Sequence, residues 1–271
     1  MGSGGMDLSV LRSETADFYR QTLRVLTDAD VKFMVGGAFA LTRYTDVERY
    51  TKDLDLFLPN AELRTAIEAL HDAGMQTELT HAHWLAKVVH DADTVDLIFA
   101  SGNGVIHVDK AWFNHAGRTE ILGIETWVCP PEETIAMKSF VMERERFDGA
   151  DVAHMFKSAA GQIDWERLLN LFGPHWLILY CHLLLFCYIY PSRRGSIPDW
   201  VMDDFDKRLH KLRETPPLKE DICRGTLLSR AQYLQDIEEN GFIDARHWPE
   251  GTMTSEEIAE WTAAIKKDGP K

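Results

Sequence analysis

One short segment restricts the fold of this chain more than any other: residues 53–58, with the sequence DLDLFL. Successive side chains of a β-strand point to opposite faces of the sheet, so residues i and i+2 share a face. The segment therefore predicts a strand that buries its leucines and presents Asp53 and Asp55 together on the other face. Two neighbouring carboxylates repel each other unless a cation lies between them, and paired hard oxygens are what Mg²⁺ accepts. For an isolated pair, a solvated acidic strand face is the alternative interpretation.

The segments around this strand alternate between helical and strand patterns. Apolar residues at steps of three and four between Ala16 and Leu26 predict an amphipathic helix. Residues 31–35 predict a short strand that ends at Gly36-Gly37, and residues 84–89 and 94–100 predict two more strands. The interleaving predicts an α/β (α+β) fold, a mixed sheet flanked by helices.

The pattern changes at Cys129-Pro130-Pro131, after which only helical patterns follow. We therefore predict an α/β domain over residues 6–128 and an all-α C-terminal region over residues 129–271. Residues 1–5 resemble an expression scar ahead of a native Met6. The apolar stretch from Trp176 to Tyr190 is shorter than the roughly 20 residues that a bilayer requires, so we expect a buried helix and no membrane partner.

The charge of the chain restricts its partners. The 271 residues include 29 Lys and Arg against 43 Asp and Glu, a formal net charge of −14. Such a surface repels phosphate backbones, which argues against a duplex-DNA-binding protein and disfavours RNA. It does not exclude one small anion held by a metal.

The cysteines and histidines indicate the compartment and argue against zinc. None of the four cysteines forms a CxxC pair, which favours a reduced, cytoplasmic protein. His81 and His83 share a strand face, but with no cysteine or clear fourth ligand nearby, a polar surface is favoured over a zinc site.

Two further features carry chemistry when they are combined with the acidic pair. Gly36-Gly37 ends one predicted strand and opens a helix, a turn that lets backbone N–H groups approach an anion; alternatively it is only a tight turn. Asp96 lies inside the apolar strand TVDLIF, where an unpaired carboxylate is costly to bury; alternatively it is a strand-end turn former. If its strand pairs beside that of Asp53, three carboxylates converge, as two-metal phosphoryl-transfer sites require.

The order of these motifs resembles the nucleotidyltransferase superfamily of DNA polymerase β, most of all its small bacterial members, including those of toxin and abortive-infection systems. The resemblance covers roughly residues 31–151. It rests on Val35-Gly36-Gly37 with Ala38 and Leu41, on residues 51–56 (TKDLDL), on Val95-Asp96-Leu97, and on a helix with Lys138 followed by Arg146-Phe147-Asp148. The family commonly has Gly-Ser at the first motif, where this chain has the Gly-Gly that several small members share.

The resemblance implies roles for individual residues. Asp53 and Asp55 would hold two Mg²⁺ (or Mn²⁺) ions, and Asp96 would bind the catalytic one and help to activate the acceptor hydroxyl. An NTP would be the donor substrate. The nucleotide-binding residues implied are Gly36 and Gly37, which would cradle the β and γ phosphates, and Lys87 and Lys138, which would neutralise the triphosphate.

The expected activity is transfer of a nucleoside monophosphate from an NTP to a hydroxyl or phosphate acceptor, with release of pyrophosphate. A DxD glycosyltransferase would explain Asp53 and Asp55 but leave Gly36-Gly37 and Asp96 unused. In a haloacid-dehalogenase-type phosphatase the pair follows the first strand directly and usually has Thr or Val two residues on, where this chain has Phe57. The non-enzymatic alternative is a catalytically silent binding module, for example one half of a toxin–antitoxin pair with a partner protein. The acceptor stays open among an antibiotic, a tRNA end, a protein side chain and a metabolite.

Overall fold

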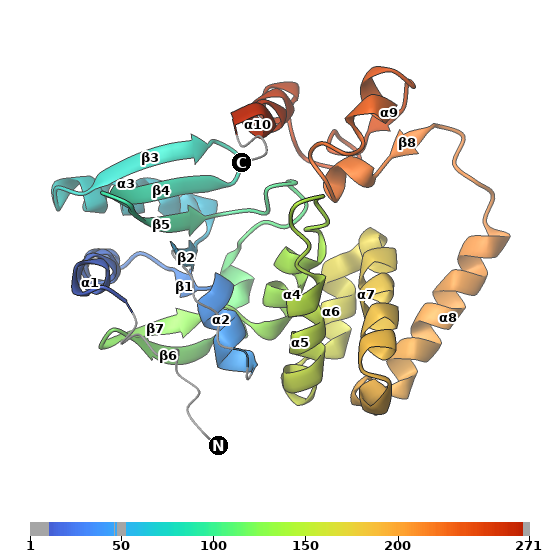
Figure 1. Cartoon of the computed structure of the whole chain (residues 1–271), viewed down its shortest axis with the longest axis horizontal. Helices are drawn as coiled ribbons and strands as arrows, with labels where there is room; N and C mark the ends of the chain where they lie inside the picture. Colours follow the sequence, from blue (N-terminus) through green and yellow to red (C-terminus); the bar gives the residue numbers. More distant parts are fainter. Residues whose placement is uncertain (1–10, 46, 48–52, 268–271) are drawn as a thin grey trace. The chain divides into compact units, whose positions relative to one another are not determined.

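The computed structural model describes residues 11–45, 47 and 53–267 (Figure 1). The chain divides into two compact units, one of residues 1–130 with 253–263 and the other of residues 131–252 with 264–271. The predicted expression scar, residues 1–5, and the Thr51-Lys52 pair of the second motif lie outside the described residues.

A seven-stranded mixed sheet forms the centre of the first unit, with the strand order β3-β4-β5-β2-β1-β7-β6. The pairs β1–β7 and β2–β5 are parallel, and the other neighbouring strands are antiparallel. The strands are β1 (Met34–Val35), β2 (Asp53–Phe57), β3 (Gln76–His81), β4 (Leu85–His90), β5 (Asp93–Ile98), β6 (Gly117–Ile121) and β7 (Ile124–Val128).

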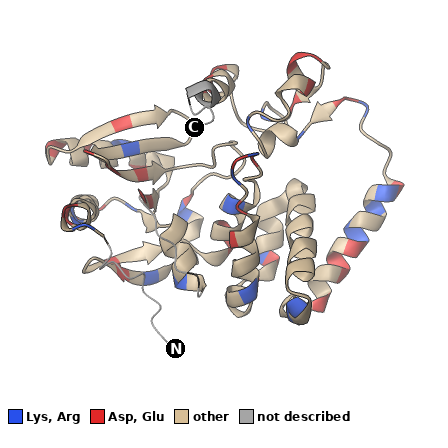
Figure 2. Ribbon diagram, viewed as in Figure 1, with Lys and Arg blue, Asp and Glu red and all other residues tan. Residues whose placement is uncertain are grey.

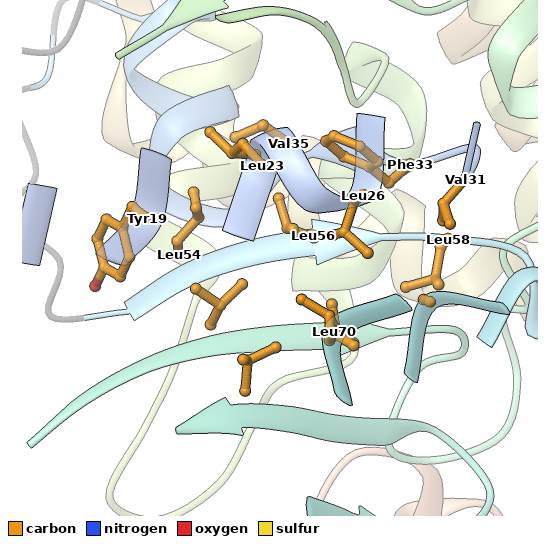
Figure 3. Close-up of a cluster of buried hydrophobic side chains, with 14 of the residues drawn as sticks. Tyr19, Leu23, Leu26, Val31, Phe33, Val35, Leu54, Leu56, Leu58 and Leu70 are labelled. Atoms are coloured by element: carbon orange, nitrogen blue, oxygen red, sulfur yellow. The ribbon is translucent and has the colours of Figure 1, made fainter. Parts of the chain in front are cut away.

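Helices complete this unit: α1 (Ser13–Asp28), α2 (Gly37–Tyr44), α3 (Asn60–Asp72) and, from the C-terminal end of the chain, α10 (Ser255–Lys267) as far as residue 263. The main core of the unit contains residues from α1, β2 and α3, and Figure 3 shows their side chains. Leu54 and Leu56 of β2 are fully buried there, as the alternation in residues 53–58 predicts. The predicted sheet flanked by helices is confirmed.

The second unit is mainly helical, as predicted. Its helices are α4 (Pro131–Ser139), α5 (Gly149–Ala159), α6 (Trp165–Phe172), α7 (Trp176–Ile189), α8 (Asp199–Glu214) and α9 (Leu234–Glu238). It also contains a parallel pair of two-residue strands, β8 (Ile222–Cys223) and β9 (Ile243–Asp244). Strands this short have no detectable period, so the sequence pattern does not reveal them.

The division between the units differs from the predicted boundary. The first unit extends to residue 130 and includes residues 253–263, which the sequence pattern assigns to the C-terminal region. Trp261 of α10 explains this return, because its ring packs edge-on against His81, His83 and Trp84 of the first unit. Contacts between rings so far apart in the chain are not visible in local periodicity.

The apolar stretch around α7 is longer and less buried than expected. A helical stretch over Trp165–Ile189, of mean hydropathy 1.5 and with 28% of its most apolar window buried, is long and apolar enough to cross a membrane by length and composition alone. Within the second unit, one side of α7 packs inward, where His182 bonds to the Ser139 carbonyl oxygen at 2.9 Å. Leu184 and Tyr188 are exposed, so the prediction of a buried helix is correct for one side only. Acidic and basic residues are interspersed along α8, whereas α7 carries none (Figure 2).

Candidate active site

Three carboxylates share one face at the centre of the sheet. The parallel pairing of β2 with β5 places Asp53 opposite Thr94 and Asp55 opposite Asp96. Directly opposed residues of neighbouring strands point to the same face, and Asp53 and Asp55 alternate with the fully buried Leu54. The expected pairing of the two strands is confirmed, and the carboxylates lie on the face opposite to the core leucines.

The two glycines form a tight turn directly beside Asp55. The Gly36 N–H donates to the Asp55 carbonyl oxygen at 2.9 Å, and α2 begins at Gly37. Gly37 has φ +51°, and a Cβ atom at this position would overlap the Asp55 carboxylate. A Cβ on Gly36 would overlap the Phe57 ring. Only glycine therefore lets the Asp55 carboxylate lie this close to the backbone that opens α2.

Lys87 on β4 lies directly opposite Asp96, and its Nζ donates to Asp96 Oδ1 at 2.8 Å. The two side chains are 27% and 15% exposed. Burial raises the pKa of Asp96 above 3.8, the Lys87 ammonium opposes that rise, and the charge of Asp53 adds to it. Lys87 therefore balances the charge of the partly buried Asp96.

The aspartates create a negative electrostatic potential around Tyr19 of α1. Burial, followed by the charges of Asp53, Asp93, Asp55 and Asp96, raises the pKa of Tyr19 well above its usual value of 10.0. Figure 3 shows this side chain of α1 beside Leu54. Carboxylates concentrated in this way attract a cation.

The carboxylate oxygens of Asp53, Asp55 and Asp96 are donors that a hard divalent cation prefers. In the described part of the chain, however, these side chains do not form a ready-made metal site. Among the described residues, no group of three His, Cys, Asp or Glu side chains is arranged to hold a metal ion. Asp96 is turned to the Lys87 ammonium, and Asp53 accepts a hydrogen bond from Thr94 Oγ1 at 2.9 Å. Carboxylate oxygens suit Mg²⁺ and Mn²⁺, and the Gly37 turn leaves room for the Asp55 carboxylate, so these residues fit such an ion.

Lys138 is a residue of α4, in the second unit. Its Nζ lies 2.7 Å from Asp151 Oδ2 and 3.3 Å from Asp148 Oδ2. Arg146 also donates two hydrogen bonds to Asp148, at 3.0 and 2.8 Å. Burial alone would raise the pKa of Asp148, but these two cations hold it below 3.8. The Lys138 ammonium is therefore already paired with two carboxylates.

Sequence reasoning missed Thr94, which the structure joins to Asp53. The spacing of the two aspartate motifs contains a signal that could have identified Thr94. Thr94 stands two residues before Asp96, as Asp53 stands two residues before Asp55. In a parallel pair with Asp55 opposite Asp96, equal offsets place Asp53 and Thr94 opposite each other.

The histidine pair forms an aromatic cluster. His81 stacks on Trp84 with ring centroids 5.8 Å apart, and His83 Nε2 lies 3.1 Å from the Gly102 carbonyl oxygen. With Trp261 packed edge-on against these rings, the two histidines form part of an aromatic packing cluster, where the sequence pattern predicts a polar surface.

Comparison with known proteins gives one family and several distant likenesses. A family model described as "Nucleotidyl transferase of unknown function (DUF2204)" matches residues 15–172. No curated protein matches the chain. The solution structure of the antibiotic-resistance factor ANT(2'')-Ia is 13% identical with a TM-score of 0.45, covering 64% of this chain and 98% of that one.

Two further solved structures are similarly distant. The lincosamide antibiotic adenylyltransferase LnuA is 14% identical with a TM-score of 0.37, covering 53% of this chain and 96% of that one. An antigenic nucleotidyltransferase-like protein from Paracoccidioides brasiliensis is 14% identical with a TM-score of 0.42, covering 69% and 93%. At these TM-scores the likenesses carry no argument about function.

Proposed function

This chain belongs to the family of nucleotidyl transferases of unknown function (DUF2204), and we propose on that premise that it transfers a nucleoside monophosphate from an NTP to an acceptor. The acceptor is a hydroxyl or phosphate group, and pyrophosphate is released. The observation that supports this most is the placement of Asp53, Asp55 and Asp96 on one face of two paired strands. A solvated acidic strand face would account for the first two aspartates but not for the third in register with them.

The three aspartates have distinct proposed roles. Asp53 and Asp55 bind two divalent cations, Mg²⁺ or Mn²⁺, and Asp96 binds one of them and helps to take up the proton of the acceptor hydroxyl. Bound there, such ions neutralise charge on the triphosphate and favour ionisation of the acceptor oxygen. A carboxylate within hydrogen-bond reach of that hydroxyl can act as its general base.

The proposed phosphate contact involves fewer backbone N–H groups than the Gly36-Gly37 motif implies. Because the Gly36 N–H already donates to the Asp55 carbonyl oxygen, we assign the phosphate contact to the Gly37 N–H and the first turn of α2. The positive end of the α2 dipole supports an anion at this place. Lys87 is proposed to add positive charge for the triphosphate on leaving Asp96. The triphosphate-binding role of Lys138 stays a prediction from the family resemblance.

The reaction is a direct displacement. The acceptor oxygen forms a bond to the α-phosphorus, the bond from that phosphorus to the bridging oxygen breaks, and pyrophosphate leaves with the electron pair. Catalysis then depends on positioning and charge neutralisation, with no covalent intermediate on the protein.

The test is a panel of NTPs labelled at the α- or the γ-phosphate, incubated with Mg²⁺, the protein and cell extract. We expect the α label to enter an acceptor and the γ label to appear in pyrophosphate. Asp53→Asn and Asp55→Asn should abolish transfer, whereas Asp72→Asn, an exposed aspartate of α3, should not. Normal transfer by either of the first two variants would refute the assignment.

The same panel separates the alternatives. Movement of the sugar of a nucleotide-sugar donor would indicate a glycosyltransferase. Binding of NTP and Mg²⁺ without pyrophosphate release would indicate a silent binding module.

A further inference from the structure

We propose that Thr94 is a positioning residue that orients the Asp53 carboxylate for the divalent cation; this inference rests on the proposed function. Thr94 and Asp53 are directly opposite each other on β5 and β2, and Thr94 Oγ1 donates to Asp53 Oδ1 at 2.9 Å. Side chains that hold a metal ligand in place commonly decide its affinity, because the ligand need not be ordered on binding.

The hydroxyl suits this task because it is neutral and points at one oxygen only. Asp53 is exposed, and a hydrogen bond that restricts rotation of an exposed carboxylate reduces what must be ordered when a cation binds. The hydrogen bond from Thr94 Oγ1 to Oδ1 fixes one edge of the Asp53 carboxylate. The Asp96 carboxylate, by contrast, is bound to the Lys87 ammonium, which must move away before a metal ion can take its place.

Thr94 is itself held rigidly. The preceding residue, Asp93, points to the opposite face of β5, where it accepts two hydrogen bonds from Arg12 at 3.1 and 3.0 Å and one from Thr15 at 2.8 Å. These contacts tie the start of β5 to the first turn of α1. A β-branched side chain in a strand also has restricted χ1 rotation, so the hydroxyl has little freedom.

These contacts form one continuous path from α1 through Asp93 and Thr94 to Asp53. Asp93 is only 13% exposed, so its carboxylate is largely shielded from solvent where Arg12 and Thr15 bind it. The path explains why a threonine at this position does more than the valine that a strand equally accepts: both shapes fit a strand, but only threonine supplies the donor.

The experiment measures Mn²⁺ affinity without nucleotide, by calorimetry, together with thermal unfolding. Thr94→Val removes the hydroxyl with little change of shape, and we expect it to weaken Mn²⁺ binding about tenfold. Thr94→Ser keeps the donor and should bind Mn²⁺ within about twofold of the wild type. The matched control is Thr119→Val, a strand threonine on β6 in the same sheet, which should leave the affinity unchanged.

The outcomes are distinguishable. Wild-type affinity in Thr94→Val, or a Thr94→Ser variant as weak as Thr94→Val, overturns this inference while leaving the proposed function intact. A wild-type protein that binds no Mn²⁺ overturns this inference, whereas the labelled NTP panel decides the proposed function. If Thr94→Val unfolds at a lower temperature, the Mn²⁺ affinity of Thr94→Ser still decides. Thr94→Ser keeps the donor and should bind Mn²⁺ like the wild type, whereas Asp53→Asn, which loses the ligand, should bind it as weakly as Thr94→Val does.

Discussion

The ion pair between Lys87 and Asp96 allows a quantitative test of how the acidic site is stabilised. Replacing Lys87 with Met keeps the apolar length of the side chain and removes the ammonium that donates to Asp96 Oδ1 at 2.8 Å. Asp96 is then left with a carboxylate that is 15% exposed and has lost its cation. We expect the variant to be less stable at neutral pH.

The magnitude follows from the geometry. At 2.8 Å, Coulomb's law with an effective dielectric constant of about 20 gives an attraction of about 6 kcal/mol. Desolvation of two partly buried ions offsets much of this, so we expect a coupling free energy of about 1–3 kcal/mol. The loss in Lys87→Met should be about 2–3 kcal/mol, below the roughly 3–5 kcal/mol of a fully buried pair because both groups retain some solvent.

The pH dependence has a defined sign. The pKa of Asp96 is already raised above 3.8, chiefly by burial, and loss of the Lys87 ammonium raises it further. A carboxyl group whose pKa is higher in the folded than in the unfolded protein binds its proton more tightly in the fold. The free energy of unfolding that Lys87→Met loses relative to the wild type should therefore be largest at neutral pH. The loss should shrink as the pH falls through the raised pKa of Asp96.

The assay is a double-mutant cycle with Lys87→Met, Asp96→Asn and the double variant, followed by urea unfolding at several pH values. Asp96→Asn removes the charge but keeps the shape, so the double variant should recover most of the stability that Lys87→Met loses. Additive effects, within about 0.3–0.5 kcal/mol, would refute the reasoning. So would a deficit that grows as the pH falls.

Two further predictions follow from the packing. Gly37→Ala forces a side chain into φ +51° and onto the Asp55 carboxylate, so thermal unfolding should show a loss of about 1–3 kcal/mol and calorimetry a weaker Mn²⁺ affinity; an unchanged affinity would argue against the role of the turn. Burial alone would raise the pKa of Asp244, but hydrogen bonds and charge from the fully buried Arg246 hold it below 3.8. Its contribution is therefore present above pH 3.8 and lost as the pH falls through the lowered pKa, so acid unfolding curves should show less pH dependence for Asp244→Asn than for the wild type.

Much of the fold follows from local patterns. The alternation in residues 53–58 predicts both the strand and the side of it that is buried, because the period of a strand is a property of its own backbone. Helix starts are local as well: Asp164 caps α6 by accepting from the Arg167 N–H at 3.0 Å. Thr254 and Glu257 form a capping box at the start of α10.

Long-range partners could not be predicted in the same way. That Lys87 binds Asp96, that Thr94 binds Asp53 and that Trp261 returns to the first unit depend on which strands and helices become neighbours. The motif resemblance predicts that Asp96 joins the acidic pair. It implies Lys87 only as a cation for the triphosphate, and it says nothing of Thr94.

The sequence by itself determined where the strand with two aspartates lies, which of its sides is buried, and that two glycines precede it. Only the tertiary structure decided that β5 lies beside β2 in parallel with Asp96 level with Asp55, and that Thr94 and Lys87 each hold one carboxylate. The physical reason is that backbone periodicity acts over a few residues, whereas the choice and register of a neighbouring strand are set by the packing of the whole sheet against α1 and α3.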